Sequence, residues 1–176
     1  MEQLLTDQQV EEALDKLYQA ILPQLPTETR IAIVGIRTRG ETLAQRLVDR
    51  LAADRPGLAI EHGVLDITFY RDDLSRRRGV PLVRATEIDF DLDDTWILLV
   101  DDVLATGRSV RAALDALHDF GRPKAIRLAV LIDRGGHELP IAADFVGMKV
   151  QAPANCRVQV KLKESDDEEG VYIVEQ

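Results

Sequence analysis

Two adjacent carboxylates, Asp101 and Asp102, come directly after the strongly apolar run 96–100. The short stretch 105–109 (ATGRS) follows them and opens a segment whose apolar residues have helical spacing. A buried strand, a short loop and a helix in this order are typical of open α/β sheets, in which ligands bind at the carboxyl ends of the strands. The acidic pair and the loop after it therefore form a candidate site.

The residues after the acidic pair are of the types that bind a phosphate monoester. Free backbone amides at a helix N-terminus favour an anion, and Gly107 lets the backbone approach it closely. The hydroxyls of Thr106 and Ser109 can donate to phosphate oxygens. Asp101 and Asp102 would repel that phosphate, so they require hydroxyl groups or a metal ion. A phosphate at one end and a diol at the other describe a ribose 5-phosphate, although an acidic strand end before an ordinary capped helix is the alternative.

Composition limits the classes of protein that fit this chain. Its 176 residues suit one domain with a sizeable core, and we expect a single domain over 1–176. No apolar run is long enough to span a membrane, and the polar N-terminus does not resemble a secretory signal. The single cysteine, Cys156, excludes an internal disulfide framework, and the three histidines show no metal-binding spacing. We expect a cytoplasmic protein with no membrane partner.

The formal charge of −9 is unevenly distributed. Residues 1–30 hold six acidic and two basic side chains, and residues 164–176 hold six acidic and no basic ones. The body between them carries 20 basic and 19 acidic side chains, so it is nearly neutral. The overall charge counts against generic nucleic-acid binding, but the body can accept a polyanionic small substrate.

Strands alternate with helices along the chain, which predicts an α/β fold with a mainly parallel sheet flanked by helices. We expect helices capped at Thr6 and ended by Pro23, over Glu41–Ala53, and around Val110–Leu117. We expect strand character over 31–34, 59–70, 96–100, 126–132, 158–163 and 171–174, and a loop over 71–81. The acidic run 164–169 favours a solvated hairpin or terminal loop.

The loop 35–40 (GIRTRG) has glycines spaced as in a nucleoside triphosphate loop. Such a loop requires a lysine and then a serine or threonine at its end, whereas Glu41 and Thr42 stand there. A carboxylate in place of the phosphate-binding lysine excludes that function. A strand-to-helix turn with solvated arginines remains one interpretation of this loop.

The ten residues 100–109 (VDDVLATGRS) resemble the phosphoribosyl-pyrophosphate (PRPP) binding motif of type I phosphoribosyltransferases. The resemblance extends over nearly the whole chain, through the segments 35–40, 65–73 and 121–147. It is most specific to one subfamily, the bifunctional pyrimidine operon attenuation regulators with uracil phosphoribosyltransferase activity. This subfamily implies a small hood, built from the chain ends, beside the parallel sheet.

The resemblance implies that uracil and PRPP give UMP and pyrophosphate, with Mg²⁺ bound together with PRPP. Asp101 and Asp102 would bind the ribose diol directly or through the metal, and they would stabilise positive charge on the ring in the transition state. Arg39 would bind the pyrophosphate, and we count it with the two aspartates as catalytic. The full set of expected substrate-binding residues is Thr38, Arg39, Arg71, Asp101, Asp102, Val103, Leu104, Ala105, Thr106, Gly107, Arg108, Ser109 and Arg134.

Two members of this set have a plain alternative. Arg71 precedes the run 76–78 of three arginines, which resembles the flexible loop that closes over PRPP but could equally be a solvated loop. Arg134 follows Asp133 at the end of a strand, where an ion pair that organises a turn is the other interpretation. Ala105 favours a pyrimidine over a purine by comparison with relatives, and no side chain stands out as general base.

The subfamily also implies a homo-oligomer that, with UMP bound, attenuates transcription by binding a stem-loop in pyrimidine-operon mRNA. Such a surface needs clustered cations, because phosphates dominate affinity for RNA. The first helix is acidic, with Lys16 as its only cation. Candidates elsewhere, which could also be ordinary surface charge, are Lys124, Arg127, Lys149, Arg157, Lys161 and Lys163. A salvage enzyme without an RNA role, or an RNA-binding regulator with vestigial activity, remains the alternative.

Overall fold

The computed structural model of this chain describes residues 1–76, 78–81 and 83–176. Within them, one sheet has five parallel strands in the spatial order β3-β2-β4-β5-β6. These strands are β2 (Ile31–Ile36), β3 (Ile60–Leu65), β4 (Trp96–Leu104), β5 (Ala125–Asp133) and β6 (Phe145–Lys149). The predicted α/β class with a parallel sheet is confirmed.

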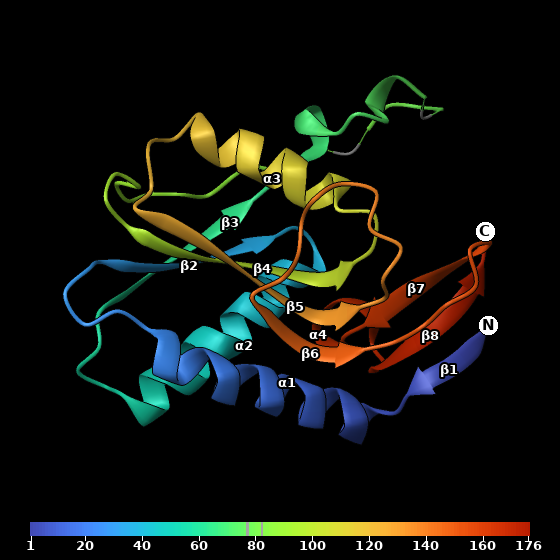
Figure 1. Cartoon of the computed structure of the whole chain (residues 1–176), viewed down its shortest axis with the longest axis horizontal. Helices are drawn as coiled ribbons and strands as arrows, with labels where there is room; N and C mark the ends of the chain where they lie inside the picture. The colour runs from blue at the N-terminus through green and yellow to red at the C-terminus, as the bar shows by residue number, and fades with distance from the viewer. Residues whose placement is uncertain (77, 82) are drawn as a thin grey trace.

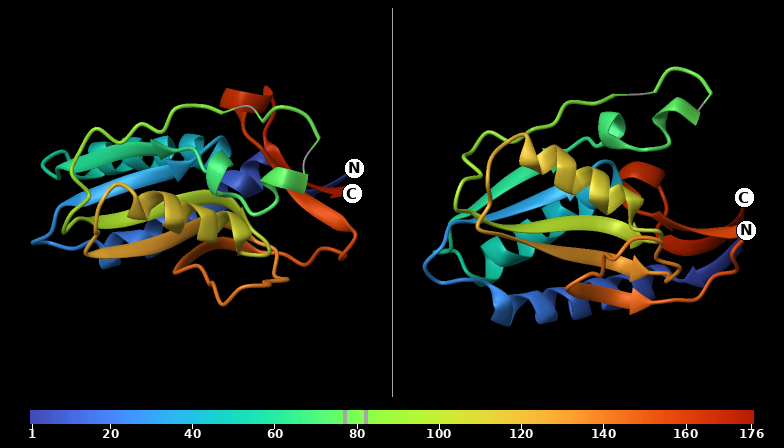
Figure 2. Two further views of the ribbon diagram at one scale, coloured as in Figure 1. Left: turned by 90° about the horizontal axis from the view of Figure 1, so that it is seen from above. Right: turned by 45° about the horizontal axis from the view of Figure 1, so that its top comes forward.

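Helices cover both faces of this sheet, with α1 (Asp7–Ile21) and α2 (Arg39–Asp54) on one face and α3 (Arg108–His118) on the other (Figures 1 and 2). Side chains alternate between the two faces along β2. Ile31 and Ile33 belong to the core cluster that includes α1 and α2, whereas Ala32 and Val34 belong to the cluster that includes α3. Every residue of β2 is buried, which explains its continuous apolar sequence.

A second, antiparallel sheet joins the two ends of the chain in the order β1-β8-β7. Its strands are β1 (Glu2–Leu5), β7 (Cys156–Lys161) and β8 (Gly170–Glu175). Figure 1 shows it beside the carboxyl ends of β5 and β6, with the two termini close together. This sheet is the hood that the resemblance implied. Short helices complete the fold, namely η1 (Leu22–Gln24), η2 (Thr68–Tyr70), η3 (Leu74–Arg76) and α4 (Lys163–Asp166).

Several sequence-based boundaries need correction. The chain begins with a strand rather than a helix, because Glu2–Leu5 pairs with β8. The strand expected over 59–70 ends at Leu65, and 68–70 form a helical turn in which Tyr70 donates its amide to the Ile67 carbonyl. The strand expected to end at Val100 continues to Leu104, since its last residues still pair with β5. The strand β6 was not predicted.

The acidic segment 164–169 connects the antiparallel strands β7 and β8, as expected for a hairpin, and four of its six residues are exposed. It begins in α4 and packs against α2, where Arg39 and Arg46 pair with its carboxylates. The Glu169 side chain is only 7% exposed, so the expected solvation does not hold for this residue. Among the described residues, no helix combines the length and the apolar sequence that a membrane span requires.

Candidate functional site

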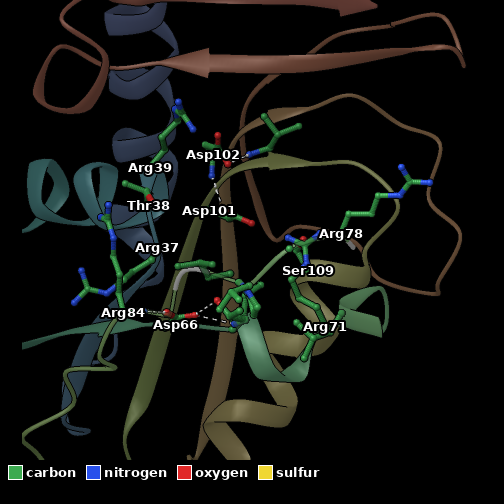
Figure 3. Close-up of a pocket in the computed structure, with 18 residues that line it drawn as sticks. Arg37, Thr38, Arg39, Asp66, Arg71, Arg78, Arg84, Asp101, Asp102 and Ser109 are labelled. Carbon is green, nitrogen blue, oxygen red and sulfur yellow. Dashed lines mark hydrogen bonds between the residues drawn. The ribbon is translucent and has the colours of Figure 1, made fainter. Parts of the chain in front are cut away.

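A cavity of about 550 Å³ lies where the loops after β2, β3 and β4 meet. Figure 3 shows Asp101 and Asp102 in its middle, between the loop that carries Thr38 on one side and Ser109 on the other. The predicted site residues in its lining are Thr38, Arg39, Arg71, Asp101, Asp102, Val103 and Ser109. The parallel register of β2 and β4 explains this meeting, because it brings their carboxyl ends to one edge of the sheet.

The acidic pair lies within the last part of β4 rather than in the loop after it. Asp101 is only 7% exposed, and Asp102 is partly buried. The Asp101 Oδ1 atom accepts the backbone N–H of Asp102 at 2.9 Å, and Asp102 Oδ1 accepts that of Val103 at the same distance. These bonds occupy one oxygen of each carboxylate with backbone donors.

Burial raises the pKa of Asp101 well above its ordinary value, and the neighbouring charge of Asp102 raises it further. Burial also raises the pKa of Asp102, but its bond with Asp101 and the positive charge of Arg39 oppose that rise. The ionised form of the two carboxylates is therefore unfavourable at the bottom of the cavity, because nearby positive charge does not fully compensate for their burial. A cation or a set of hydroxyl donors would stabilise that form.

The loop after β4 reaches its helix through a left-handed residue. Gly107 has φ +91°, and the first backbone bond of α3 runs from the Arg111 amide to the Gly107 carbonyl at 3.0 Å. The Arg108 amide donates to the Thr106 hydroxyl at 3.3 Å, whereas the amides of Ser109 and Val110 have no acceptor within the helix and are the ones available to an anion. Among the loop residues, Ser109 is in the cavity lining, whereas Ala105, Thr106, Gly107 and Arg108 are not.

The loop after β5 supports the loop 105–109 from behind. The Thr106 carbonyl accepts the amides of Glu138 at 2.9 Å and Leu139 at 3.2 Å. A Cβ atom on Gly107 would lie 3.4 Å from the Cβ of Ile141. This support fixes the position of the backbone that would surround a phosphate.

The loop between β2 and α2 forms the second wall of the cavity. Thr38 immediately precedes α2, and Gly40 lets the helix pack closely on β4, since a Cβ there would lie 2.5 Å from the Val100 carbonyl oxygen. Arg39 lines the cavity, and its guanidinium pairs with Asp166 of α4 at 2.6 Å. The hood thus contributes a carboxylate to a predicted substrate-binding arginine.

Arg37 is a cavity residue that the sequence-based set missed. Its Nη1 donates to Glu41 at 2.9 Å, its Nε donates to the Ala85 carbonyl at 2.9 Å, and its Nη2 lies 3.3 Å from Glu87. These contacts tie the loop before α2 to the segment 85–87. The glycines and arginines of the GIRTRG loop indicated that this loop lines the site. The loop sequence alone did not distinguish the role of Arg37 from that of Arg39.

The third wall, formed by the segment after β3, was also missed in part. Asp66 and Arg84 line the cavity, and Figure 3 shows them next to each other. Burial would raise the pKa of Asp66, but hydrogen bonds from Thr68 and from the Arg84 amide outweigh burial and hold it below its ordinary value. Asp66 is thus an ionised carboxylate that closes the turn between β3 and the loop.

The arginine-rich loop contributes to the cavity from above. Arg71 and Arg78 are in the lining, and Arg71 pairs with Asp73 through two bonds of 2.9 and 3.0 Å. Arg77, which belongs to the predicted three-arginine run, lies outside the described residues. Arg71 and Arg78 thus line the same cavity as the acidic pair.

Like Ala105, Thr106 and Gly107, the predicted site residues Leu104, Arg108 and Arg134 are not in the lining. Arg108 bridges Asp72 at 2.7 Å and Glu138 at 2.9 Å, so its guanidinium joins two loops instead of entering the cavity. Arg134 donates from Nη1 to the Cys156 carbonyl at 2.8 Å and ties the end of β5 to the hood. Leu104 is buried in the core on the α3 face.

The family model for the phosphoribosyl transferase domain matches residues 1–163 of this chain. Curated relatives match almost all of it. The "Bifunctional protein PyrR" of Deinococcus radiodurans is 47% identical over 98% of this chain and 92% of its own length. The protein of the same name from Pelotomaculum thermopropionicum is 47% identical over 98% and 95%, and that from Bacillus cereus is 45% identical over 97% and 95%.

Solved structures share the fold at low sequence identity. A hypoxanthine-guanine phosphoribosyltransferase from Bacillus anthracis has a TM-score of 0.72 at 16% identity and covers 97% of this chain and 96% of its own. A hypoxanthine phosphoribosyltransferase from Trypanosoma cruzi has a TM-score of 0.72 at 14% identity over 98% and 94%. These likenesses show that the architecture is shared.

Proposed function

The chain belongs to the phosphoribosyl transferase domain family, and from this premise we propose that it converts uracil and PRPP into UMP and pyrophosphate. In the same proposal it is also the UMP-dependent regulator that attenuates pyrimidine-operon transcription, as the resemblance to the bifunctional subfamily implies. The whole chain, 1–176, acts as one domain and assembles as a homodimer or a larger homo-oligomer. The close match to proteins named "Bifunctional protein PyrR" over 98% of the chain supports both roles.

The observation that carries the enzymatic role is the separation of charge within one cavity. Asp101 and Asp102 supply negative charge at its floor, Arg39 and Arg37 supply positive charge at one wall, and the start of α3 supplies free amides near Ser109. PRPP has the matching pattern, with a diol between a pyrophosphate and a 5′-phosphate. Each part of the substrate thus has a wall of complementary chemistry.

Phosphoribosyl transfer breaks the bond between the anomeric carbon and the pyrophosphate oxygen and forms a bond from that carbon to N1 of uracil, which loses its proton. Asp101 and Asp102 accept hydrogen bonds from the ribose hydroxyls and stabilise positive charge that develops on the ring. The loop 105–109 holds the 5′-phosphate, which fixes the anomeric carbon relative to both carboxylates. Arg39 and Arg71 stabilise the negative charge of the departing pyrophosphate.

The donor set fits a magnesium ion that arrives with PRPP. Asp101 and Asp102 offer carboxylate oxygens, the ligand type that Mg²⁺ prefers, and their buried negative charge lacks a partner of equal strength. No group of three or more metal-binding side chains occurs among the described residues, so oxygens of PRPP would complete the coordination. When bound, the ion would neutralise charge on the pyrophosphate.

Closure of the arginine-rich loop would exclude water from the reaction. An electron-poor anomeric carbon is exposed as pyrophosphate leaves, and water would compete with uracil for it. Arg71 and Arg78 extend from this loop into the cavity lining, so their contacts with the pyrophosphate would draw the loop over the substrate. The base would then meet a site that is already closed.

The first experiment uses chromatography to measure the formation of UMP from uracil and PRPP in the presence of Mg²⁺. We expect activity in the wild type, a fall of at least about 100-fold in kcat/KM for Asp102→Asn, and wild-type activity for Asp49→Asn, an exposed acid on α2. PRPP binding without UMP formation in the wild type, or full activity in Asp102→Asn, would overturn the catalytic role. A panel of uracil, hypoxanthine, guanine and orotate tests the choice of base, which Ala105 leads us to expect to be uracil.

The RNA-binding role depends on cations that the fold distributes unevenly. Lys124 precedes β5 and contacts Thr29, whereas Lys149 lies beside Asp133, at the other end of that strand, in the register of β5 and β6. At about 3.3 Å per residue, these two lysines lie on the order of 30 Å apart. The six candidates therefore do not form one compact patch. Those that are exposed on the hood or beside it are Lys149, Arg157 and Lys163.

A gel-shift titration with a pyrimidine-leader stem-loop tests this second role. We expect binding that requires UMP and weakens steeply with salt, because RNA phosphates release counterions on binding. Lys149→Gln should weaken binding, whereas Lys124→Gln, at the far end of β5, should not. A chain that makes UMP but does not shift the stem-loop at low salt would be a salvage enzyme without the regulatory role.

A further inference from the structure

The acidic segment 164–169, which joins β7 to β8 of the hood, reaches the candidate site. Three ion pairs join this segment to α2: Arg39 with Asp166, and Arg46 with both Glu164 and Glu169. The paired residues are more than 100 positions apart in sequence, so the contacts depend on the tertiary fold. Of the three pairs, the one between Arg39 and Asp166 involves a residue of the cavity lining.

Asp166 is held by four hydrogen bonds. Its Oδ1 accepts Arg39 Nη2 at 2.6 Å, and its Oδ2 accepts Arg39 Nε at 3.1 Å. The same Oδ2 accepts the Leu162 amide and the Ser165 hydroxyl, each at 2.9 Å. Burial would raise the pKa of Asp166, but the bonds from Arg39 and Leu162 outweigh burial and hold that pKa below its ordinary value. A carboxylate with this many donors has a fixed position, and it remains ionised.

Arg39 consequently has one free edge. The edge formed by Nε and Nη2 faces Asp166, so Nη1 and the second hydrogen of Nη2 are the donors left for a ligand. An arginine side chain is long and has many rotamers, and ordering it when a ligand binds lowers affinity. Asp166 orders this side chain before the ligand arrives, through a two-bond geometry that a lysine could not reproduce.

We propose that Asp166 is a positioning residue for phosphoribosyl transfer, which holds the Arg39 guanidinium at the cavity wall with its Nη1 edge directed to the pyrophosphate of PRPP. This inference rests on the proposed function. It assigns a role in the substrate site to the acidic C-terminal segment, whose composition alone indicated only a solvated surface. Arg46 has a supporting part, since its pairs with Glu164 and Glu169 attach the segment to α2.

Asp166 has a second physical effect on Arg39, which would weaken PRPP binding instead of strengthening it. A carboxylate beside an arginine also neutralises part of its charge, so Asp166 could compete with pyrophosphate for Arg39. Positioning predicts that removal of the Asp166 charge weakens PRPP binding, whereas competition predicts that it strengthens binding. The two effects have opposite signs in a single measurement.

The experiment measures the Kd of PRPP by calorimetry, together with KM and kcat for UMP formation. We expect Asp166→Asn to raise the Kd and KM of PRPP about tenfold, the size of one charge-assisted contact, with a smaller change in kcat. Arg39→Lys keeps the charge but loses the two-bond geometry, so it should raise Kd to a similar extent. Asp167→Asn is the matched control, because Asp167 is the exposed acid directly after Asp166, and it should leave the Kd of PRPP within about twofold of wild type.

A double variant separates positioning from any other role of the hood. If Asp166 acts through Arg39, then Asp166→Asn should change the Kd of PRPP by less than about twofold when Arg39 is already alanine. Equal or tighter PRPP binding by Asp166→Asn, or additive losses in the double variant, would overturn the inference. The wild-type UMP assay decides the proposed function separately, because these comparisons depend only on PRPP binding relative to wild type.

Discussion

The Asp101 carboxylate accepts the backbone N–H of Asp102 at 2.9 Å, which holds it next to a second acidic residue at the end of one buried strand. Two neighbouring charges in a buried position are unfavourable without a ligand. Burial raises the pKa of Asp101, and the adjacent Asp102 raises it further. The free protein thus carries an electrostatic cost at the place where a substrate diol or a cation would bind.

Replacing Asp101 by asparagine should therefore stabilise the protein while it weakens activity. A raised native pKa stabilises the fold at low pH, and this contribution is lost as the pH rises through the native pKa. Asparagine has no proton to lose, so the Asp101→Asn variant keeps its stability as the pH rises. At pH 8 it should therefore melt at a higher temperature than wild type, and a difference of about 1 kcal/mol in the free energy of unfolding would correspond to about 2–4 °C. The difference should vanish near pH 4, where Asp101 is protonated. Calorimetric scans across this range test the prediction, and a variant that melts lower at pH 8 would contradict it.

The same pKa shift predicts the pH dependence of catalysis. The ribose diol and Mg²⁺ require ionised carboxylates, and Asp101 loses its proton only above the pH range of an ordinary aspartate. We expect kcat/KM for PRPP to fall on the acidic side with a midpoint above pH 4. Asp102→Asn removes the neighbouring charge and should shift that midpoint of the residual activity downward. A midpoint that does not move would show that the limb belongs to another group.

Gly107→Ala tests whether the left-handed residue before α3 shapes the phosphate loop. A side chain at φ +91° is strained by about 1 kcal/mol, and the new Cβ would also lie 3.4 Å from Ile141. We expect a small loss of stability together with a rise of about tenfold or more in the Kd of UMP, because the amides no longer surround its phosphate. Gly57→Ala, at a position with nothing within 4 Å of the added Cβ, is the control. Unchanged UMP binding in Gly107→Ala would contradict this role for the loop.

Arg108→Gln tests the coupling between two loops that border the cavity. Its guanidinium bridges Asp72 and Glu138, and exposed ion pairs of this kind contribute little to stability. We expect an unchanged melting temperature, faster amide exchange over 70–76, and a KM for PRPP that is about two- to threefold higher. Arg55→Gln, an exposed arginine after α2, should change none of these. If exchange over 70–76 stays as in wild type, the bridge does not order that loop.

Local signals in the sequence were sufficient for the central elements. Thr6 and Gln9 form the predicted capping box at the start of α1, with both reciprocal bonds present. The apolar runs that became β2 and the first part of β4 are buried along their length, because a central parallel strand has no solvent face. The acidic pair followed such a run, so its position at the sheet edge could be predicted without knowledge of distant contacts.

Elements whose stability depends on remote partners were not predictable in this way. The strand β1 has only four residues and exists because Glu2 pairs with Ile173 near the other end of the chain. The acidic segment 164–169 forms the expected connection between two antiparallel strands, but its contacts with Arg39 and Arg46 on α2 could not be predicted from its composition. The side chain of Arg108 likewise turned from the expected ligand to Asp72 and Glu138, which no spacing in the sequence indicates.

Arg37 illustrates how such a remote contact can be tested. Its Nε donates to the Ala85 carbonyl, 48 positions away, while Nη1 pairs with Glu41 and the side chain is only 14% exposed. Arg37→Met should lower the free energy of unfolding by about 1.5–3 kcal/mol, the usual value of a hydrogen bond to a charged group, because Glu41 and the Ala85 carbonyl both lose a donor. Arg37→Lys keeps the ion pair but not the second bond, so it should lose about half as much. Urea unfolding measures both, and amide exchange over 83–87 should rise in the same order. Equal stability of the methionine variant and wild type would show that this arginine does not hold segment 85–87 against the cavity wall.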